Sequence, residues 1–207
     1  KDFSGRFSLD KALMNDKLKV GVGLSYYTGG YRIDSVNVFK AGNDPSGVMG
    51  FVVESAATDN GAVGIGSRKF TDRTYTGVDF QLSYDWKPGT TAIRAEFISG
   101  NQPGFASDTK SPNDKTPISK DIYNRNFNGG ILYLTQNIMK TPFQLVVKYD
   151  WYDPNTDVKG DEIGKVSTVK TTNAADLKYD TIGLGMAYML DSNTKITAYY
   201  DMVNNET

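Results

Sequence analysis

The chain has 207 residues, a formal net charge of −1 and no cysteine or histidine, which excludes disulfides, Ser-His triads and the commonest metal ligand. The balanced charge offers no basic patch of the kind that nucleic acid requires, so we expect no nucleic-acid partner. No apolar run approaches the roughly 20 residues of a membrane-spanning helix, but a strand of a membrane barrel is only half apolar and gives a weak hydropathy signal.

Alternation of apolar and polar residues recurs eight times along the chain. Successive side chains of a strand point to opposite faces, so each alternating segment predicts a two-faced strand. From Phe143 to Trp151, apolar and aromatic residues occupy one parity, while the other parity is polar except for Val146. The eight segments are residues 3–13, 17–27, 76–86, 91–99, 127–136, 143–151, 181–190 and 195–202.

The connections between these segments alternate between short and long. Tight polar turns are predicted at residues 14–16, 87–90, 138–142 and 191–194, and long loops at about 28–75, 100–123 and 153–178. Most predicted strands have about 9–11 residues, the length that a tilted strand needs to cross a bilayer. Short turns at one end and long loops at the other are typical of an outer-membrane barrel, in which the long loops are extracellular. We therefore expect an all-β fold, a transmembrane antiparallel up-and-down β-barrel.

Aromatic residues gather near both ends of the predicted strands. Such positions suit two interfacial girdles, although Tyr and Trp also favour strands in general. The candidates beside the short turns are Tyr84, Trp86, Phe143 and Tyr188, and those towards the long loops are Tyr26, Phe97, Tyr149, Trp151 and Tyr200.

The polar parity carries the candidate pore-lining charges, six positive and six negative. They are Arg6, Lys17, Lys19, Arg94, Lys148 and Lys195, against Asp10, Asp79, Asp85, Glu96, Asp150 and Asp201. Such charges can set ion selectivity in a pore, or they can pair across neighbouring strands and stiffen the wall. We expect pairing for most of them. The equal count of positive and negative charges gives no case for a strongly anionic or cationic filter.

No motif in the chain predicts catalysis or a cofactor. The stretch from Asp153 to Asp157 resembles the start of a calcium loop, but Val158 and Gly164 stand where that loop needs Gly and Glu. Gly21 and Gly23 lie inside a predicted strand and more simply make room or permit bending there. No residues pair into a nucleophile set or an acid and a base, so we expect neither an enzyme nor a metal site.

Five fragments resemble the phosphate-selective porin O/P family, and most of all its Bacteroidetes branch. They are AEFISGNQPG, RNFNGGILYLTQNI, LVVKYDWYDPNTDVKGDEIG, LKYDTIGLGMAYML and KITAYYDMVNNET, at residues 95–104, 125–138, 145–164, 177–190 and 195–207. The resemblance covers the second half of the chain, where the fragments occur in the family's order and with matching spacing. Residues 1–75 share only the general character of the family and no specific fragment. KYDWYDPN is its most specific piece.

The resemblance implies an outer-membrane barrel of about sixteen strands that passes small anions by diffusion. It also implies that the barrel is commonly trimeric and is surrounded by outer-membrane lipid and lipopolysaccharide. Eight strands would then be half of such a barrel, and both ends of the family pattern are missing here. Basic residues line the constriction of typical members of the family. The equal numbers of positive and negative pore-lining charges here give little support for phosphate selectivity in this chain. Two alternatives stay open: a closed eight-strand barrel that binds or assembles through its long loops, and a soluble β-domain that binds carbohydrate.

Overall fold

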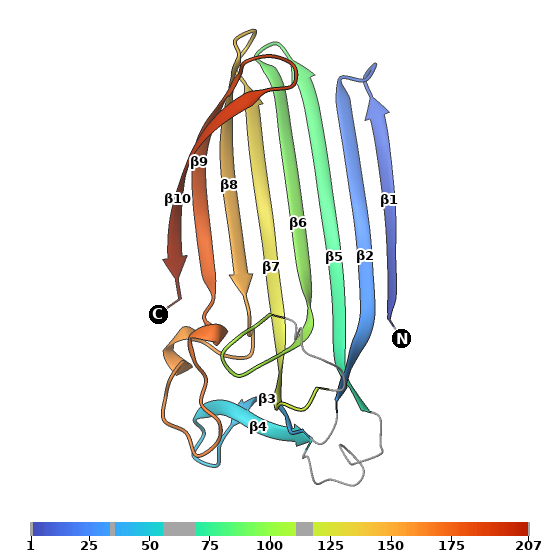
Figure 1. Ribbon diagram of the computed structural model, residues 1–207. Coiled ribbons are helices and arrows are strands. Elements are labelled where there is room, and N and C mark those ends of the chain that lie inside the picture. Colours follow the sequence, from blue (N-terminus) through green and yellow to red (C-terminus); the bar gives the residue numbers. More distant parts are fainter. Residues whose placement is uncertain (1, 34–35, 56–68, 111–117, 207) are drawn as a thin grey trace.

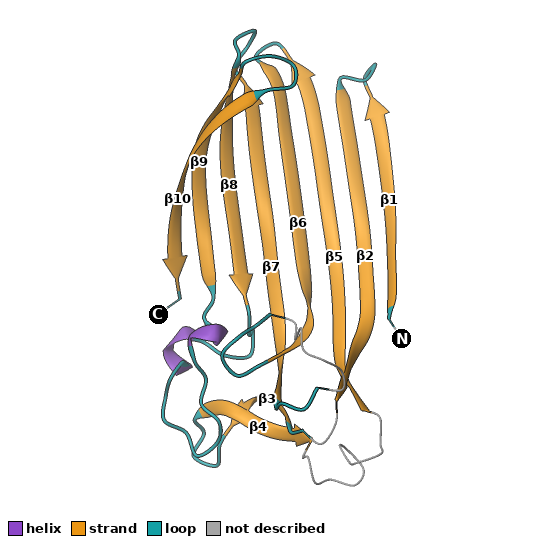
Figure 2. Ribbon diagram, in the orientation of Figure 1, coloured by secondary structure: helices purple, strands orange, loops and turns teal. Residues whose placement is uncertain are grey.

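The computed structural model describes residues 2–33, 36–55, 69–110 and 118–206, which form ten strands and two short 3-10 helices (Figures 1 and 2). The strands are β1 (Phe3–Leu13), β2 (Leu18–Ile33), β3 (Val38–Asn43), β4 (Met49–Ser55), β5 (Lys69–Trp86), β6 (Gly89–Gly104), β7 (Ile122–Asn137), β8 (Phe143–Asp153), β9 (Tyr179–Met189) and β10 (Lys195–Asn205). The helices are η1 (Gly160–Glu162) and η2 (Ala174–Asp176).

Eight of these strands form one continuous antiparallel wall in the order β1-β2-β5-β6-β7-β8-β9-β10. The short turns lie together at one end of the wall and the long connectors at the other (Figure 1). This confirms the all-β, up-and-down architecture. The sheet is open, because within the described residues β1 pairs only with β2 and β10 only with β9. Closure of these eight strands on themselves, one of the alternatives, is therefore not observed.

The predicted loop at 28–75 requires correction, because much of it is strand. Thr28–Ile33 and Lys69–Thr74 extend β2 and β5 as a paired ladder, and β3 and β4 form a hairpin between them. Backbone pairing continues here although the apolar alternation has stopped, since the ladder depends on main-chain groups and not on the side-chain pattern. Residues 34–35 and 56–68 of this segment lie outside the described part.

The other two connectors are also shorter than predicted or more structured. β6 runs to Gly104 and β7 begins at Ile122, so the predicted 100–123 loop loses residues at both ends. The 153–178 connector begins as β8 ends at Asp153 and contains only η1 and η2 as regular structure. As a result, β2, β5, β6 and β7 have 16 to 18 residues each and pass beyond the 9–11 expected for a bilayer crossing.

Burial on the wall is inverted relative to a water-soluble sheet. On β9, Leu184 is 49% exposed, whereas Thr181 and Ala187 on the opposite parity are 5% and 1% exposed. The same holds on β2, where Gly21 and Gly23 are buried while Val22 and Leu24 are exposed. We call the exposed side the apolar face and the enclosed side the polar face. A soluble sheet would bury the apolar side instead.

The compact apolar core lies beyond the end of the wall, in a unit that we call the cap: residues 36–55, 105–110, 118–121 and 154–178. β3 adds to the extended end of β7 in parallel, from Val38 opposite Ile122 to Lys40 opposite Asn124. Two buried clusters fill the cap and its junction with the wall. They are Ile33, Val36, Val38, Ile118 and Ile122, and Phe39, Phe51 and Tyr123. The long connectors thus fold on one another (Figure 1).

A buried ion pair ties strand β7 to two of the long connectors. Arg125 Nε donates to Asp176 Oδ1 at 2.8 Å, and the two side chains are 2% and 0% exposed. The remaining guanidinium nitrogens donate to the carbonyl oxygens of Phe105 and Ala106 at 3.0 and 3.1 Å. Asn155 Nδ2 donates to the same Asp176 oxygen at 2.9 Å. A buried pair persists only when its other polar atoms are also bonded, as they are here.

Asp44 joins the β3–β4 turn to the 154–178 connector. Its Oδ1 accepts from the backbone of Ser46 and Val48, and its Oδ2 accepts from Ser167 Oγ and from the backbone and hydroxyl of Thr168. The hydrogen bonds from Thr168 and Val48, with the Ser167 hydroxyl, hold the pKa of the Asp44 carboxyl well below its usual range. The carboxylate is therefore charged at neutral pH and holds the β3–β4 turn against the 154–178 connector.

Candidate functional site

The strand register places the predicted pore-lining charges on the polar face. One unbroken row of cross-strand neighbours crosses all eight wall strands: Asp10, Gly21, Gln81, Arg94, Tyr133, Lys148, Gly183 and Asp201. The next row towards the long connectors contains three acids, Asp79, Glu96 and Asp150. Lys17 lies in the turn before β2, and Lys195 begins β10 at the short-turn end.

Five of the twelve predicted charges form ion pairs. Arg6 pairs with Asp79 at 2.8 Å, and Lys148 contacts Asp150 at 2.8 Å and Asp201 at 3.5 Å. Within the described residues no ion pair within 4.0 Å involves the other seven, which are Asp10, Lys17, Lys19, Asp85, Arg94, Glu96 and Lys195. The expectation that most of these charges pair is therefore wrong. The strand register, and not the equal number of charges, determines which side chains meet.

Glycines on the polar face make room for large neighbours, as the sequence predicted for Gly21 and Gly23. A Cβ at Gly23 would lie 2.3 Å from Asp79 Oδ2 and 2.7 Å from Arg6 Nη2, so the ion pair occupies the space of a side chain. At Gly185 a Cβ would lie 2.2 Å from Cδ2 of Tyr199. The Tyr199 ring therefore rests on the bare backbone of β9.

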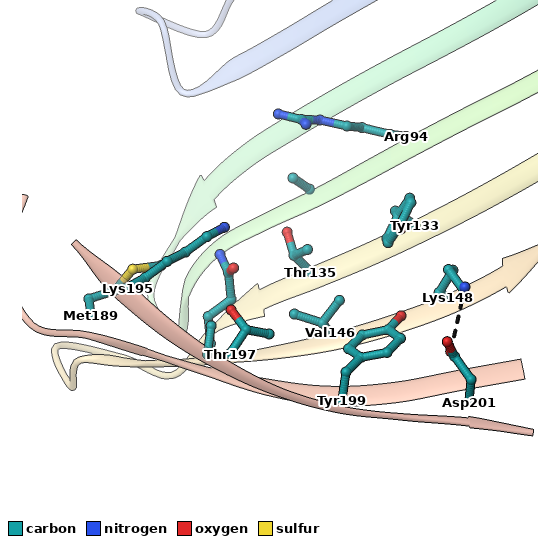
Figure 3. A pocket seen from close by; sticks show the side chains of 13 residues that line it. Arg94, Tyr133, Thr135, Val146, Lys148, Met189, Lys195, Thr197, Tyr199 and Asp201 are labelled. Atoms are coloured by element: carbon teal, nitrogen blue, oxygen red, sulfur yellow. Dashed lines mark ion pairs between the residues drawn. The ribbon is translucent and has the colours of Figure 1, made fainter. Parts of the chain in front are cut away.

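A hollow of about 670 Å³ opens on the polar face towards the short-turn end (Figure 3). Its floor consists of short side chains from β6 to β9, among them Ala92, Thr135, Val146 and Ala187. The other lining residues are Arg94, Tyr133, Gln144, Lys148, Met189, Lys195, Thr197, Tyr199 and Asp201.

The hollow is locally basic although the wall as a whole is balanced. Three cations line it, Arg94, Lys148 and Lys195, against one acid, Asp201. Lys148 is neutralised by Asp150 and Asp201. Arg94 and Lys195 are the two cations of the hollow with no ion pair among the described residues, so the excess positive charge resides on them. A count along the sequence misses this excess because it sums charges that the register separates.

The nine predicted girdle aromatics all lie on the apolar face, where strand alternation and register place them. At the short-turn end Phe143 packs against Tyr188 with ring centroids 5.1 Å apart, and Tyr84 stacks on Trp86 at 6.5 Å. Tyr26 and Tyr200 lie apart from the other long-loop aromatics, on β2 and β10.

The remaining girdle aromatics form a group at the long-loop end of the wall. Trp151 contacts Phe97 at 6.2 Å and Tyr149 at 5.8 Å between ring centroids. The Trp151 indole donates to Asn128 Oδ1 at 2.9 Å, so its polar atom is bonded, and the side chain as a whole is half-buried. An apolar ring with a bonded N–H suits a membrane interface.

A second aromatic row, on the polar face beneath the cap, was not singled out by the sequence. Its rings contact in series with centroids 5.4 to 6.1 Å apart: Tyr27, Tyr75, Phe127, Tyr152 and Tyr179. Arg73 lies 4.5 Å from the Tyr27 ring centroid and donates to Tyr31 Oη at 2.7 Å. The row crosses the wall from β2 to β9 through β5, β7 and β8. Its members alternate like any strand aromatic, so no sequence signal sets them apart.

Comparison with protein-family models, curated proteins and solved structures finds no match to this chain. Within the described ranges, no helix has the length and apolarity needed to cross a membrane. The same ranges hold no group of three or more acidic side chains placed to bind a metal ion. Asp153 and Asp157, from the stretch that resembles a calcium loop, accept hydrogen bonds from Asn155 N at 3.1 Å and Asn126 Nδ2 at 2.8 Å.

Proposed function

We propose that this chain belongs to the wall of a bacterial outer-membrane porin that gives small hydrophilic solutes and ions, including anions such as phosphate, a path for passive diffusion. The observation that carries this proposal is the inverted burial of the wall. Large apolar side chains such as Leu24, Ile182 and Leu184 remain exposed on the wall, while small residues of the opposite face of β2 and β9, such as Gly23 and Ala187, are buried. Contact with lipid removes the cost of exposing such a face to water.

The dimensions of the wall agree with this proposal. An 11-residue strand such as β9 is about 36 Å long, and a tilt of about 45° reduces its span to about 26 Å. Outer-membrane barrels present an apolar band about 25 Å tall. The longer strands β2, β5, β6 and β7 extend past this band towards the cap, which then lies on the extracellular side. The two aromatic groups of the apolar face would lie at the two interfaces.

The resemblance to the phosphate-selective porin O/P family supports the same function and suggests a trimer in contact with outer-membrane lipid and lipopolysaccharide. The polar face supports diffusion without strong selectivity. Paired charges such as Arg6 with Asp79 present little net field, whereas Arg94 and Lys195 present a modest positive one. We therefore expect a weak anion preference, set in the half of the pore nearer the short turns.

Conductance of the full-length protein in planar bilayers tests the proposal. We expect stepwise currents and a reversal potential that indicates mild anion preference in a salt gradient. Arg94→Glu and Lys195→Glu should each shift that potential towards cations. Glu96→Gln, on the neighbouring acidic row, should shift it the opposite way. A protein that gives no current steps, or that is extracted without detergent, would rule the porin out.

The folded cap favours one alternative, an outer-membrane component that binds or assembles through its long loops. The cap has its own apolar clusters and the buried Arg125–Asp176 pair, so it presents a defined surface. Such a protein would migrate differently on gels after heating, as barrels do, and would give no current. Conductance therefore separates the two functions.

A further inference from the structure

We propose that the hollow on the polar face binds an organic carboxylate that carries an apolar or aromatic body. This inference rests on the proposed function, because the hollow must open to water for a solute to reach it. Figure 3 shows Arg94 from β6 and Lys195 from β10, with Thr135 and Val146 on the strands between them.

The charge of the hollow selects an anion. Lys148 is held by Asp150 at 2.8 Å and by Asp201 at 3.5 Å, so two carboxylates already satisfy it. Arg94 and Lys195 have no acid within ion-pairing distance among the described residues, and both side chains are exposed to the hollow. The guanidinium fork of Arg94 matches a carboxylate in a two-point contact, whereas Lys195 supplies a second charge without fixed direction.

The lining also requires an apolar body on the solute. Val146 and Ala187 give the hollow an apolar floor, and Met189 is a further apolar residue of its lining. A bare inorganic anion would pair with Arg94 and leave the apolar floor exposed to water. An organic acid would pair with Arg94 through its carboxylate and cover the floor with its apolar body. A volume of about 670 Å³ is within the range of sites that hold small organic molecules and is much larger than one inorganic ion needs.

Tyr199 provides a contact surface of fixed orientation for that body. Its ring lies against Gly183 and Gly185, where a Cβ would be 2.5 and 2.2 Å from the ring atoms. Lys148 Nζ lies 5.8 Å from the ring centroid. The ring is thus held between β9 and the Lys148 ion pair. An aromatic solute gains additional free energy from offset or edge contact with such a ring.

Binding of benzoate to the full-length protein in detergent tests the proposal. Equilibrium dialysis with labelled benzoate should show saturable binding, and unlabelled acetate or phosphate should compete much more weakly than unlabelled benzoate. Arg94→Gln and Lys195→Gln should each weaken binding, by about tenfold for the loss of one charge-assisted hydrogen bond. Lys17→Gln removes the same charge outside the hollow and should leave the affinity within about twofold. Val146→Asn should weaken benzoate and spare acetate.

Three results would overturn the inference: no saturable benzoate binding, equal competition by phosphate, or equal losses in the Lys17→Gln and Arg94→Gln proteins. Conductance of the same preparations keeps this test separate from the porin function. Current steps without benzoate binding would reject the hollow and retain the porin. Benzoate binding without current would reject the porin and retain the hollow.

Discussion

Removal of the Asp176 carboxylate should open the cap while leaving the wall intact. In the native cap this carboxylate accepts from Arg125 Nε at 2.8 Å, Asn155 Nδ2 at 2.9 Å and Asn173 N at 2.9 Å. Asp176→Ala leaves a buried guanidinium without its counterion. Breaking one side of a buried pair costs about 3–5 kcal/mol. The carbonyl oxygens of Phe105 and Ala106 still accept from Arg125, so we expect about 3 kcal/mol, the lower end of that range.

Hydrogen–deuterium exchange of the full-length protein measures this loss locally. Because about 1.4 kcal/mol corresponds to a tenfold change in an opening equilibrium, protected amides of residues 105–110 and 154–176 should exchange about a hundred times faster. Amides of β8 and β9 should not change. Asp161→Ala is the matched control, because Asp161 is exposed and pairs with Lys165 only at 3.8 Å. Unchanged exchange in the cap, or equal acceleration in the wall, would refute this account of the ion pair.

Three further predictions concern the wall and the cap. Leu184→Arg, on the exposed apolar face, should lower the free energy of unfolding in lipid vesicles by about 2–4 kcal/mol, as measured by urea unfolding. Gln81→Arg, on the polar face, should not lower it, and equal losses would contradict the assignment of the faces. Gly185→Ala should displace the Tyr199 ring and cost about 1–3 kcal/mol in the same assay, and an unchanged midpoint would show that the ring can move freely. The lowered pKa of Asp44 means that its contribution to cap stability is complete above about pH 4 and is lost as the pH falls towards the folded-state pKa. Exchange protection of the 46–48 amides, corrected for intrinsic rates, should therefore fall below that pH in the native protein and not in Asp44→Asn, and a fall centred near neutral pH would contradict the role of this carboxyl.

Strand alternation predicted most of the wall because each wall strand meets two different environments. Residues 143–151 and 181–190 alternate with few exceptions, such as Val146, and β8 and β9 occupy nearly those ranges. The β3–β4 hairpin was missed because its strands have only 6 and 7 residues and pack within the cap, where they show no sustained alternation of apolar and polar residues. The extensions of β2 and β5 were missed for a related reason, since their pairing continues after the apolar pattern ends.

The sequence could not predict which charges meet. Lys148 and Asp150 are two residues apart on one strand and were expected to lie on one face, but Asp201 joins them only through the register of β8, β9 and β10. The same limit applies to Arg125 and Asp176, which are separated by 51 residues. A slip of two residues in any ladder would keep every side chain on its face and exchange its neighbours. Faces are therefore predictable from one strand, whereas contacts require several.

The inverted burial of the wall, beside the ordinary core of the cap, imposes two different rules for substitution on one chain. In the proposed porin the apolar face meets fluid hydrocarbon, which fits any apolar shape, so exposed wall positions such as Leu184 and Ile182 would exchange among Leu, Ile, Val and Phe with little effect. Phe51 and Ile118 in the cap lie among closely packed neighbours, where the volume and shape of each side chain matter. Substitutions on the apolar face of the wall should therefore need to keep only an apolar side chain, whereas substitutions in the cap should also need to keep its volume and shape.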